Sequence, residues 1–340
     1  MKKSKMTSRG ILFTVGISSI ALAAACGTEE SSGGNTSGEA SEELEESKLI
    51  TNWFAQPEHG GNYAALQEGM YEEQGLDMEV EPGGPEVSSE QIVASGDADF
   101  GYTSGEDLLI ARNEGIPLVA IGAIFQKSPY VLISHEGQVK DFEDLEGKTV
   151  YTATGVGYWE YIKEEYGIEN VEERAYTGTL TEFVDNEDAV TQGYVTSEPY
   201  SLEEQGVDID YQYVSDSGFE SYGNVIFTTE DMIENNPEKV QAFMNATVEG
   251  WEYYRENYEE VNPFLKEQNP DLSEEKMEYS VEAQEELIFG GEAEENGFGY
   301  MNSGNWEKLQ SDLNNLGIIS NEESSEEIFT TEFLEEAQNE

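Results

Sequence analysis

Short apolar runs alternate with helix-like segments through much of the chain, and this order limits the folds open to it. Residues 118–125 are all apolar or glycine, as expected of a buried strand in a parallel sheet. Residues 76–81 alternate apolar and polar side chains, which is the period of a strand with one exposed face. Because strands that alternate with helices are typically joined by crossovers, the order predicts an α/β fold. Its sheets should be mostly parallel, with helices on both faces.

The positions of the other elements follow from the same periods and from the glycines and prolines between them. Strands are expected at 48–53, 76–81, 98–102, 118–125, 147–151, 171–176, 193–197, 210–214 and 225–228. Helices are expected at 62–73, 88–94, 106–114, 141–145, 157–166, 237–258, 273–289 and 303–316. After residue 228 the pattern is therefore helical.

The charge balance of the chain is strongly acidic. Its 340 residues include 73 Asp and Glu against 16 Lys and Arg, a formal net charge of −57. Such a chain repels phosphates, so we expect no nucleic-acid partner, and it also repels anionic lipid. Hydrophobic residues make up 37% of the chain and aromatic residues 11%, which is enough for a folded core and sets disorder aside for most of the length. The length indicates about two domains.

The acids are spread along the chain instead of forming one tail, which suits a surface kept hydrated at high salt. We interpret the protein as adapted to salt, because screening at about 1 M shortens the range of repulsion to roughly 3 Å. The midpoint of thermal unfolding should then rise between low and molar NaCl. A midpoint that stays constant or falls would contradict this interpretation.

The N-terminus has the pattern of an export signal. Lys2, Lys3, Lys5 and Arg9 precede the apolar run 11–25, which is shorter than the roughly 20 residues of a membrane-spanning helix. With Cys26 next, the segment resembles a bacterial lipoprotein signal, although Ala23 stands where such signals usually carry leucine. An ordinary signal peptide with an incidental Cys26 is the alternative. A single cysteine excludes an internal disulfide.

We therefore expect a signal peptide at 1–25, lipidation of Cys26 and an acidic tether rich in glycine and serine at 26–47. Without the first 25 residues, 12 basic residues remain against 73 acids, a net of −61. Membrane attachment would then depend on the lipid, and two or more acyl chains would be needed for stable anchoring.

An ordered set of short segments resembles a known family. The matching residues are Trp53 and the segments 58–65, 69–71, 75–76, 82–85, 93–101, 114–117, 125–129, 144–150, 196–199 and 236–238. From residue 49 to about 319 the chain is similar to an extracytoplasmic substrate-binding protein of an ABC importer. The similarity is greatest to the group that binds nitrate, sulfonates or thiamine-precursor pyrimidines.

This resemblance implies a two-lobe periplasmic-binding-protein-like fold of type II with two crossovers between the lobes. Lobe 1 would contain 48–132 and 227–320, lobe 2 would contain 133–226, and 321–340 would be an acidic tail. Ile328, Phe329, Phe333 and Leu334 could dock that tail on the body. The implied partners are a small-molecule ligand, an ABC permease and its ATPase. The implied form is an extracytoplasmic, lipid-anchored monomer without a cofactor or metal.

Ligands of open α/β sheets bind beyond the carboxyl ends of strands, and this rule selects candidate contacts. They are Trp53, His59, Tyr63, Tyr102, Ser104, Phe125, Gln126, Tyr158, Trp159 and Glu198. Each has a structural alternative as a core, capping or surface residue. Gly60 and Gly61 are expected to let the backbone approach the ligand. Glu198 also matches the second-lobe cleft position of the family through its Ser-Glu-Pro setting.

The candidate residues favour one ligand chemistry. A carboxylate in the cleft disfavours nitrate or sulfonate, and only Lys127 and Arg112 among the basic residues lie near the expected first-lobe cleft. Aromatic walls and Glu198 suit a flat heterocycle with amino groups, which stacks on rings and donates N–H bonds to the carboxylate. A pyrimidine-like ligand is therefore preferred, with a sulfonate- or nitrate-type anion as the alternative.

An enzyme is the first competing function. Related folds in fungi build a pyrimidine from their own histidine with iron held by a cysteine-rich motif, which this chain lacks. The sequence has only His59 and His135 as histidines, and it has no Walker loop, HExxH pair or GxSxG elbow. We therefore expect no enzymatic activity. A ligand sensor with the same cleft is the second alternative, and neighbouring genes for a permease and an ATPase would distinguish the two.

Overall fold

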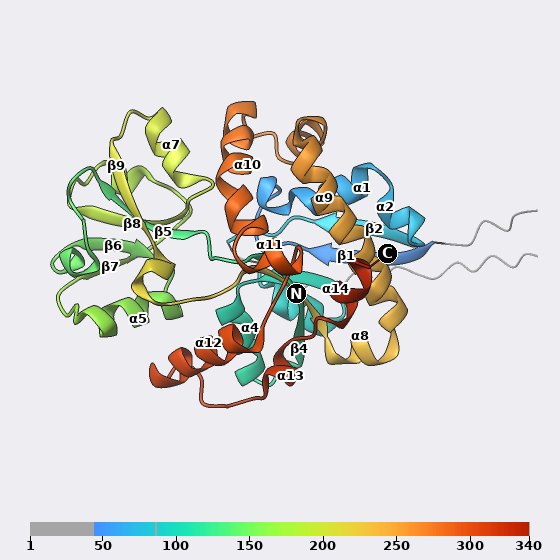
Figure 1. The fold of residues 1–340 in the computed structure, drawn as a ribbon. Helices are drawn as coiled ribbons and strands as arrows, with labels where there is room; N and C mark the ends of the chain where they lie inside the picture. Colours follow the sequence, from blue (N-terminus) through green and yellow to red (C-terminus); the bar gives the residue numbers. More distant parts are fainter. Residues whose placement is uncertain (1–43, 86, 340) are drawn as a thin grey trace, which may run out of the picture. The chain divides into compact units, whose positions relative to one another are not determined.

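A computed structural model describes residues 44–85 and 87–339 of the chain (Figure 1). The expected signal peptide, Cys26 and residues 26–43 of the expected tether lie outside the described residues. Two five-stranded sheets organise the described part, and each lies in its own lobe with helices around it. We call the lobe of the first sheet lobe 1 and that of the second sheet lobe 2.

Lobe 1 combines strands from both ends of the described part. Its strands are β1 Glu45–Ile50, β2 Leu76–Glu81, β3 Phe100–Thr103, β4 Leu118–Phe125 and β10 Gly223–Thr229. Its first helical segments are η1 Pro57–His59, α1 Gly60–Gln67, α2 Met70–Glu73, α3 Ser89–Ser95 and α4 Gly105–Asn113. Later come α8 Glu230–Asn235, α9 Pro237–Gln268, α10 Glu274–Phe289, α11 Glu292–Asn296, α12 Ser303–Asn315, α13 Ser325–Ile328 and α14 Glu332–Ala337.

Lobe 2 is formed by the middle of the chain. Its strands are β5 Tyr130–His135, β6 Thr149–Thr152, β7 Glu172–Ala175, β8 Ala189–Tyr194 and β9 Ile209–Tyr213. Its helical segments are η2 Phe142–Leu145, α5 Gly157–Tyr166, α6 Thr181–Val184, α7 Glu198–Glu204 and η3 Val214–Ser217. Segments 126–129 and 218–222 connect it to lobe 1.

The two sheets share one topology. Their strand orders are β2-β1-β3-β10-β4 and β7-β6-β8-β5-β9. In lobe 1, β10 is antiparallel to both of its neighbours, and in lobe 2 the same is true of β5. Four strands of each sheet therefore run in one direction, as the α/β pattern predicts. The reversed strand in each sheet is the first one after the chain crosses between the lobes, so the pairing is mixed.

Several local expectations were wrong. Residues 130–135 form β5, which no strand prediction included, because this strand follows β4 without an intervening helix. The strand expected at 193–197 is β8 and ends at Tyr194, since Pro199 near the start of α7 favours a helix there. Residues 45–47 of the expected tether belong to β1, where backbone pairing with β2 orders them despite their polar side chains. The expected lobe boundaries at 132/133 and 226/227 fall inside β5 and β10.

Helices α1 and α9 pack closely because glycines line their contact (Figure 1). A Cβ atom on Gly60 would lie 2.1 Å from the Tyr254 ring, and one on Gly61 would lie 2.2 Å from the Trp251 ring. Gly250 of α9 approaches the carbonyl oxygen of Gly61 in the same way. The structure thus assigns Gly60 and Gly61 a role in helix packing. This packing explains the two glycines without the approach of a ligand to their backbone.

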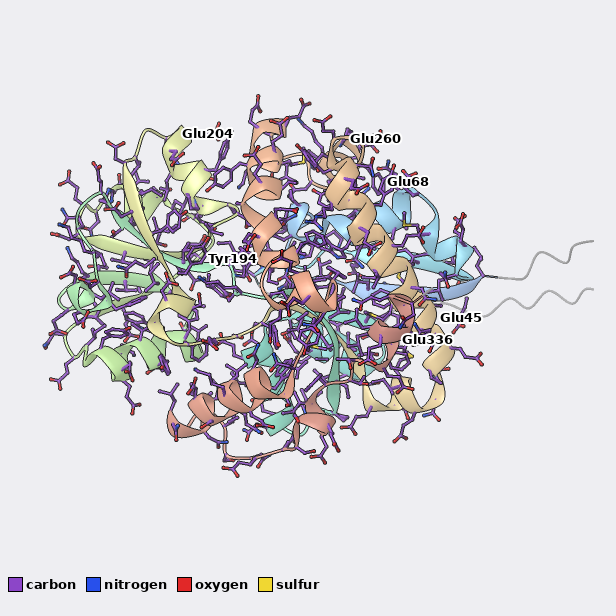
Figure 2. The ribbon with its side chains drawn as sticks, in the orientation of Figure 1. Glu45, Glu68, Tyr194, Glu204, Glu260 and Glu336 are labelled. Atoms are coloured by element: carbon purple, nitrogen blue, oxygen red, sulfur yellow. The ribbon has the colours of Figure 1, made fainter. Side chains whose placement is uncertain are left out.

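The C-terminal segment packs on lobe 1. Ile328, Phe333 and Leu334 are buried, and the backbone N–H of Thr330 donates a 2.9 Å hydrogen bond to the carbonyl of Ala120 in β4. The docking expected of these apolar residues is therefore confirmed. Figure 2 shows where the acids lie: Glu45, Glu68, Glu204, Glu260 and Glu336 project outward from both lobes, whereas Tyr194 lies between them.

Candidate functional site

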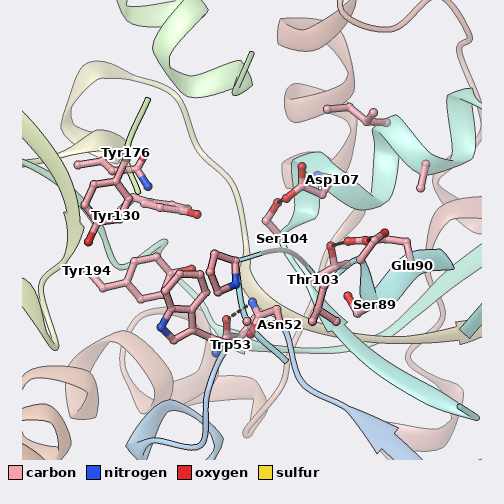
Figure 3. A pocket seen from close by; sticks show the side chains of 18 of the residues that line it. Asn52, Trp53, Ser89, Glu90, Thr103, Ser104, Asp107, Tyr130, Tyr176 and Tyr194 are labelled. Carbon is pink, nitrogen blue, oxygen red and sulfur yellow. Dashed lines mark hydrogen bonds between the residues drawn. The ribbon is translucent and has the colours of Figure 1, made fainter. Parts of the chain in front are cut away.

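A cavity of about 460 Å³ lies between the lobes, at the edge where the strands of both sheets end. Figure 3 shows tyrosines of lobe 2 on one side and hydroxyl and carboxyl groups of lobe 1 on the other. Its lining includes Asn52, Trp53, Gln56, His59, Ser88, Ser89, Glu90, Thr103, Ser104, Asp107, Glu114, Tyr130, Tyr176, Gln192, Tyr194, Ser197, Glu198 and Asn224. The reversed strands contribute their first residues, because their starts lie where the other strands end.

Aromatic side chains form one side of the cavity. The rings of Tyr130 and Tyr194 meet edge to face, with centroids 4.6 Å apart. Tyr176 follows β7 and Trp53 follows β1, so the two lobes present aromatic groups across the same space. These rings can contact a flat ligand through their edges and through their faces. Such contacts stabilise binding by more than the buried area alone would.

Glu198, at the first position of α7, lies among these rings. Its Oε2 accepts a 2.7 Å hydrogen bond from the backbone N–H of Tyr194, and its Oε1 accepts a 3.4 Å bond from the Tyr176 hydroxyl. The side chain crosses β8 at Gly193, where a Cβ atom would lie 2.8 Å from the Cβ of Glu198. Burial raises the pKa of the Glu198 carboxyl, while the Tyr194 N–H and Lys276 act in the opposite direction.

The opposite side of the cavity carries hydroxyl and carboxyl groups. Glu90 accepts hydrogen bonds from Ser88 at 2.8 Å and from Thr103, and Asp107 accepts one from Ser104 at 2.7 Å. Ser104 also accepts a bond from the Asp107 backbone N–H and so caps α4. Loss of water raises the pKa of Asp107 to about 6, and the charge of Glu90 adds to the rise.

A chain of hydrogen bonds sets the protonation of His59. The side-chain amide of Asn224 donates a hydrogen bond to the carbonyl of Glu58. The Oδ1 of Asn224 accepts a hydrogen bond from the side-chain amide of Asn52. The Oδ1 of Asn52 then accepts from Nε2–H of His59 at 3.1 Å, so we assign the proton to Nε2. Burial lowers the pKa of His59 to about 3, and the imidazole is neutral at physiological pH.

The cavity has no basic counterpart to its acids. Glu90, Asp107, Glu114 and Glu198 line it, and no Lys or Arg does so among the described residues. Arg112, expected near the cleft, is buried and pairs with Glu323 at 2.5 Å and Glu230 at 3.3 Å. Lys127 pairs with Asp216 at 3.2 Å at the crossover. The field inside the cavity therefore favours positive or N–H-rich groups.

Four of the residues selected from the sequence line the cavity, namely Trp53, His59, Ser104 and Glu198. The other six lie outside its lining. Tyr63, Phe125 and Trp159 are buried in the core, and Tyr102 is buried with its hydroxyl bonded to Asn62. Gln126 donates to the carbonyls of Ala123 and Tyr300. Tyr158 is buried and bonds to Thr152 and Gln192.

Several lining residues escaped the sequence reasoning. Tyr176 stands at the end of an expected strand, so the rule about carboxyl ends could have selected it. Tyr130 opens the strand that was not expected, and Tyr194 ends a strand whose expected position was too far along the chain. Glu90 had no signal beyond its place in a short helix, because its side chain is aimed at the cavity by tertiary contacts with Thr103.

Two α/β lobes joined by two crossover segments, with a polar and aromatic cavity between them, are the architecture of the periplasmic-binding-protein fold. The chain belongs to the NMT1/THI5-like family, whose model matches residues 56–261. The match runs from the residue before η1 to within α9, so it includes all of lobe 2 and part of lobe 1.

Relatives of known role include binding proteins and enzymes. The chain is 27% identical over 242 residues to a formylaminopyrimidine-binding protein of Halalkalibacterium halodurans, covering 64% of this chain and 69% of the relative. It is 25% identical over 229 residues to a 4-amino-5-hydroxymethyl-2-methylpyrimidine phosphate synthase of Legionella pneumophila, covering 64% and 72%.

Solved structures show the same fold. The periplasmic nitrate-binding protein of Synechocystis PCC 6803 superposes with a TM-score of 0.63 at 14% identity, covering 87% of this chain and 89% of its own. Between residues 44 and 339, Glu86 apart, no helix has both the length and the apolar character needed to cross a bilayer.

Proposed function

We propose that the protein captures a small, flat heteroaromatic solute with amino groups, of the pyrimidine type, between its two lobes. It would act outside the cytoplasm as the ligand-capture component of an ABC importer and deliver the solute to a permease and its ATPase. Attachment through lipid on Cys26 belongs to the same proposal, as does a monomeric state. A ligand sensor that uses the same cavity is the second form of this function.

The observation that carries the proposal is the pairing of aromatic rings with carboxylates in a cavity that no basic side chain of the described residues lines. Rings supply contact area for a flat ligand, and Glu198 supplies an acceptor for exocyclic amino groups. The neutral His59 and the acids opposite it add no positive charge. A nitrate or sulfonate would meet uncompensated negative charge there, which is costly in an enclosed site.

Solute binding is also the function we propose over catalysis. Some relatives are named as synthases, but no group of three or more His, Cys, Asp or Glu residues suited to a metal occurs in the part of the chain that the structure describes. His59 is buried, neutral and hydrogen-bonded on one nitrogen. We propose that His59 positions Asn52 in the cavity lining and that the protein acts without a cofactor.

A thermal-shift comparison tests the ligand class. We expect a formylaminopyrimidine to raise the unfolding midpoint of the purified protein, since a ligand at about 100 times its Kd stabilises by about 2.7 kcal/mol. Nitrate and an alkanesulfonate at the same ionic strength should leave the midpoint unchanged. A rise with the anions and none with the pyrimidine would refute the proposal in favour of the anion-binding alternative.

A further inference from the structure

Two of the places where the lobes meet outside the crossover segments each contain a buried glutamate. The first is η1 of lobe 1, where Glu58 accepts a hydrogen bond from the hydroxyl of Thr196 in lobe 2. Helix α10 of lobe 1 holds the same turn, because Ser280 donates to the carbonyl of Thr196 at 2.6 Å and Tyr279 donates to that of Val195 at 3.1 Å. Glu58 is 1% exposed.

The second place is the start of α5 in lobe 2, which lies against α4 and α12 of lobe 1. A Cβ atom on Gly157 would lie 3.0 Å from Oε2 of Glu106 and 2.6 Å from Leu313. A side chain at position 157 would have to displace both groups, so the approach of the lobes is close here as well. Glu106 is 4% exposed.

The two glutamates share an unusual environment. Oε2 of each is buried without a hydrogen-bond partner, and neither carboxyl has an ion pair with Lys, Arg or His among the described residues. An ionised carboxylate held in this way is strongly disfavoured, whereas a protonated one is not. We propose that Glu58 and Glu106 each bind a proton when the lobes come together, so that closure of the cleft takes up protons.

The surrounding groups support this reading. Burial is the main cause that raises the pKa of Glu58 to about 7 and that of Glu106 to about 8. Around Glu58, Lys276 of α10 lowers its pKa and Glu198 of α7 raises it, and Tyr194, Tyr254 and the neutral His59 lie nearby. Around Glu106, Asp107 raises its pKa and the Tyr158 N–H lowers it, with the hydroxyls of Tyr158 and Tyr130 nearby.

The direction of the pH effect follows from these shifts. In separated lobes both carboxyls meet water, and their pKa returns toward the ordinary value of 4.5. Between that pH and about 7 to 8 the joined lobes hold protons that the separated lobes have released. Acid therefore favours closure, and rising pH opposes it until both groups are ionised in the joined state. The proposal rests on the proposed function, because it assumes that solute is captured by closure.

The test uses the full-length protein without any ligand, so a failed ligand screen would not affect it. Small-angle scattering should show the ratio of joined to separated lobes falling by about tenfold or more between pH 5.5 and 7.5. Each proton that closure takes up changes this ratio by up to about tenfold per pH unit. The double variant Glu58→Gln, Glu106→Gln should stay joined at both values, since a neutral amide resembles the protonated acid. Glu307→Gln, on an exposed site of α12, should keep the wild-type profile.

A second measurement needs no variant and covers the case in which the double variant does not fold. Carbon-13 resonances of the glutamate carboxyls in the wild-type protein should include two with titration midpoints above pH 6. Ordinary midpoints for all glutamates would overturn the proposal. A radius of gyration that is independent of pH, or a pH profile that the double variant shares with the wild type, would also overturn it.

Discussion

Replacing Glu198 by glutamine should weaken binding of a formylaminopyrimidine about tenfold or more. Hydrogen bonds to a charged group are worth about 1.5–3 kcal/mol, and every 1.4 kcal/mol is tenfold in affinity. The carboxylate lies among Tyr176, Tyr194 and the cavity space, so its charge acts on the ligand at close range. Isothermal titration calorimetry at pH 7 measures the change.

The glutamine variant is a clean test because it preserves the local structure. Its amide oxygen still accepts the bond from the Tyr194 N–H, so the start of α7 should keep its position. Glu203→Gln, an exposed residue of the same helix, removes the same charge outside the cavity and should leave affinity unchanged. If Glu198→Gln binds as tightly as Glu203→Gln, Glu198 does not contact the ligand.

Replacing Gly250 by alanine should destabilise the protein by about 1–3 kcal/mol, the usual cost of overpacking a well-packed interior. The new methyl group would lie 2.3 Å from the carbonyl oxygen of Gly61 and 2.7 Å from Cβ of Ala65. Both atoms belong to α1, so relief requires movement of a whole helix. Alanine favours the helix itself by up to about 1 kcal/mol over glycine, and the clash must exceed that gain.

Urea unfolding monitored by circular dichroism measures this effect. Gly122→Ala is the matched control, since it is another buried glycine of lobe 1 whose added Cβ would come no closer than 3.4 Å to Met244. The control should change stability by much less than Gly250→Ala. A Gly250→Ala protein with the same free energy of unfolding as the wild type would show that α1 and α9 can move apart without a loss of stability.

Local pattern predicted many elements closely. The expected strands at 76–81 and 118–125 and the expected helix at 157–166 coincide with β2, β4 and α5. Each of these has a clear period and is bounded by glycine or proline, so near neighbours in the chain suffice to specify it. β5 was missed because it follows β4 across the first crossover segment without an intervening helix.

The candidate site was predicted only in part. Trp53 and Glu198 were found because they follow strands, whereas Tyr63 and Trp159 follow the same rule and are buried in the core. Strand ends place a residue at the correct edge of a sheet, but they do not say which way its side chain points. That direction is set by contacts with elements far away in the sequence, such as Phe264 beside Tyr63.

The sequence by itself determined the α/β class and the strongly acidic character of the chain, and it placed Glu198 in the cleft. These depend on composition and on periods of two to four residues, which a linear reading contains. Only the tertiary structure decided that Tyr130 and Asn224 reach the cavity from reversed strands and that Gly60 and Gly61 serve helix packing. It also decided that Glu58 and Glu106 are buried between lobes. Burial is a property of the assembled chain, because it depends on which distant segments exclude water from a group.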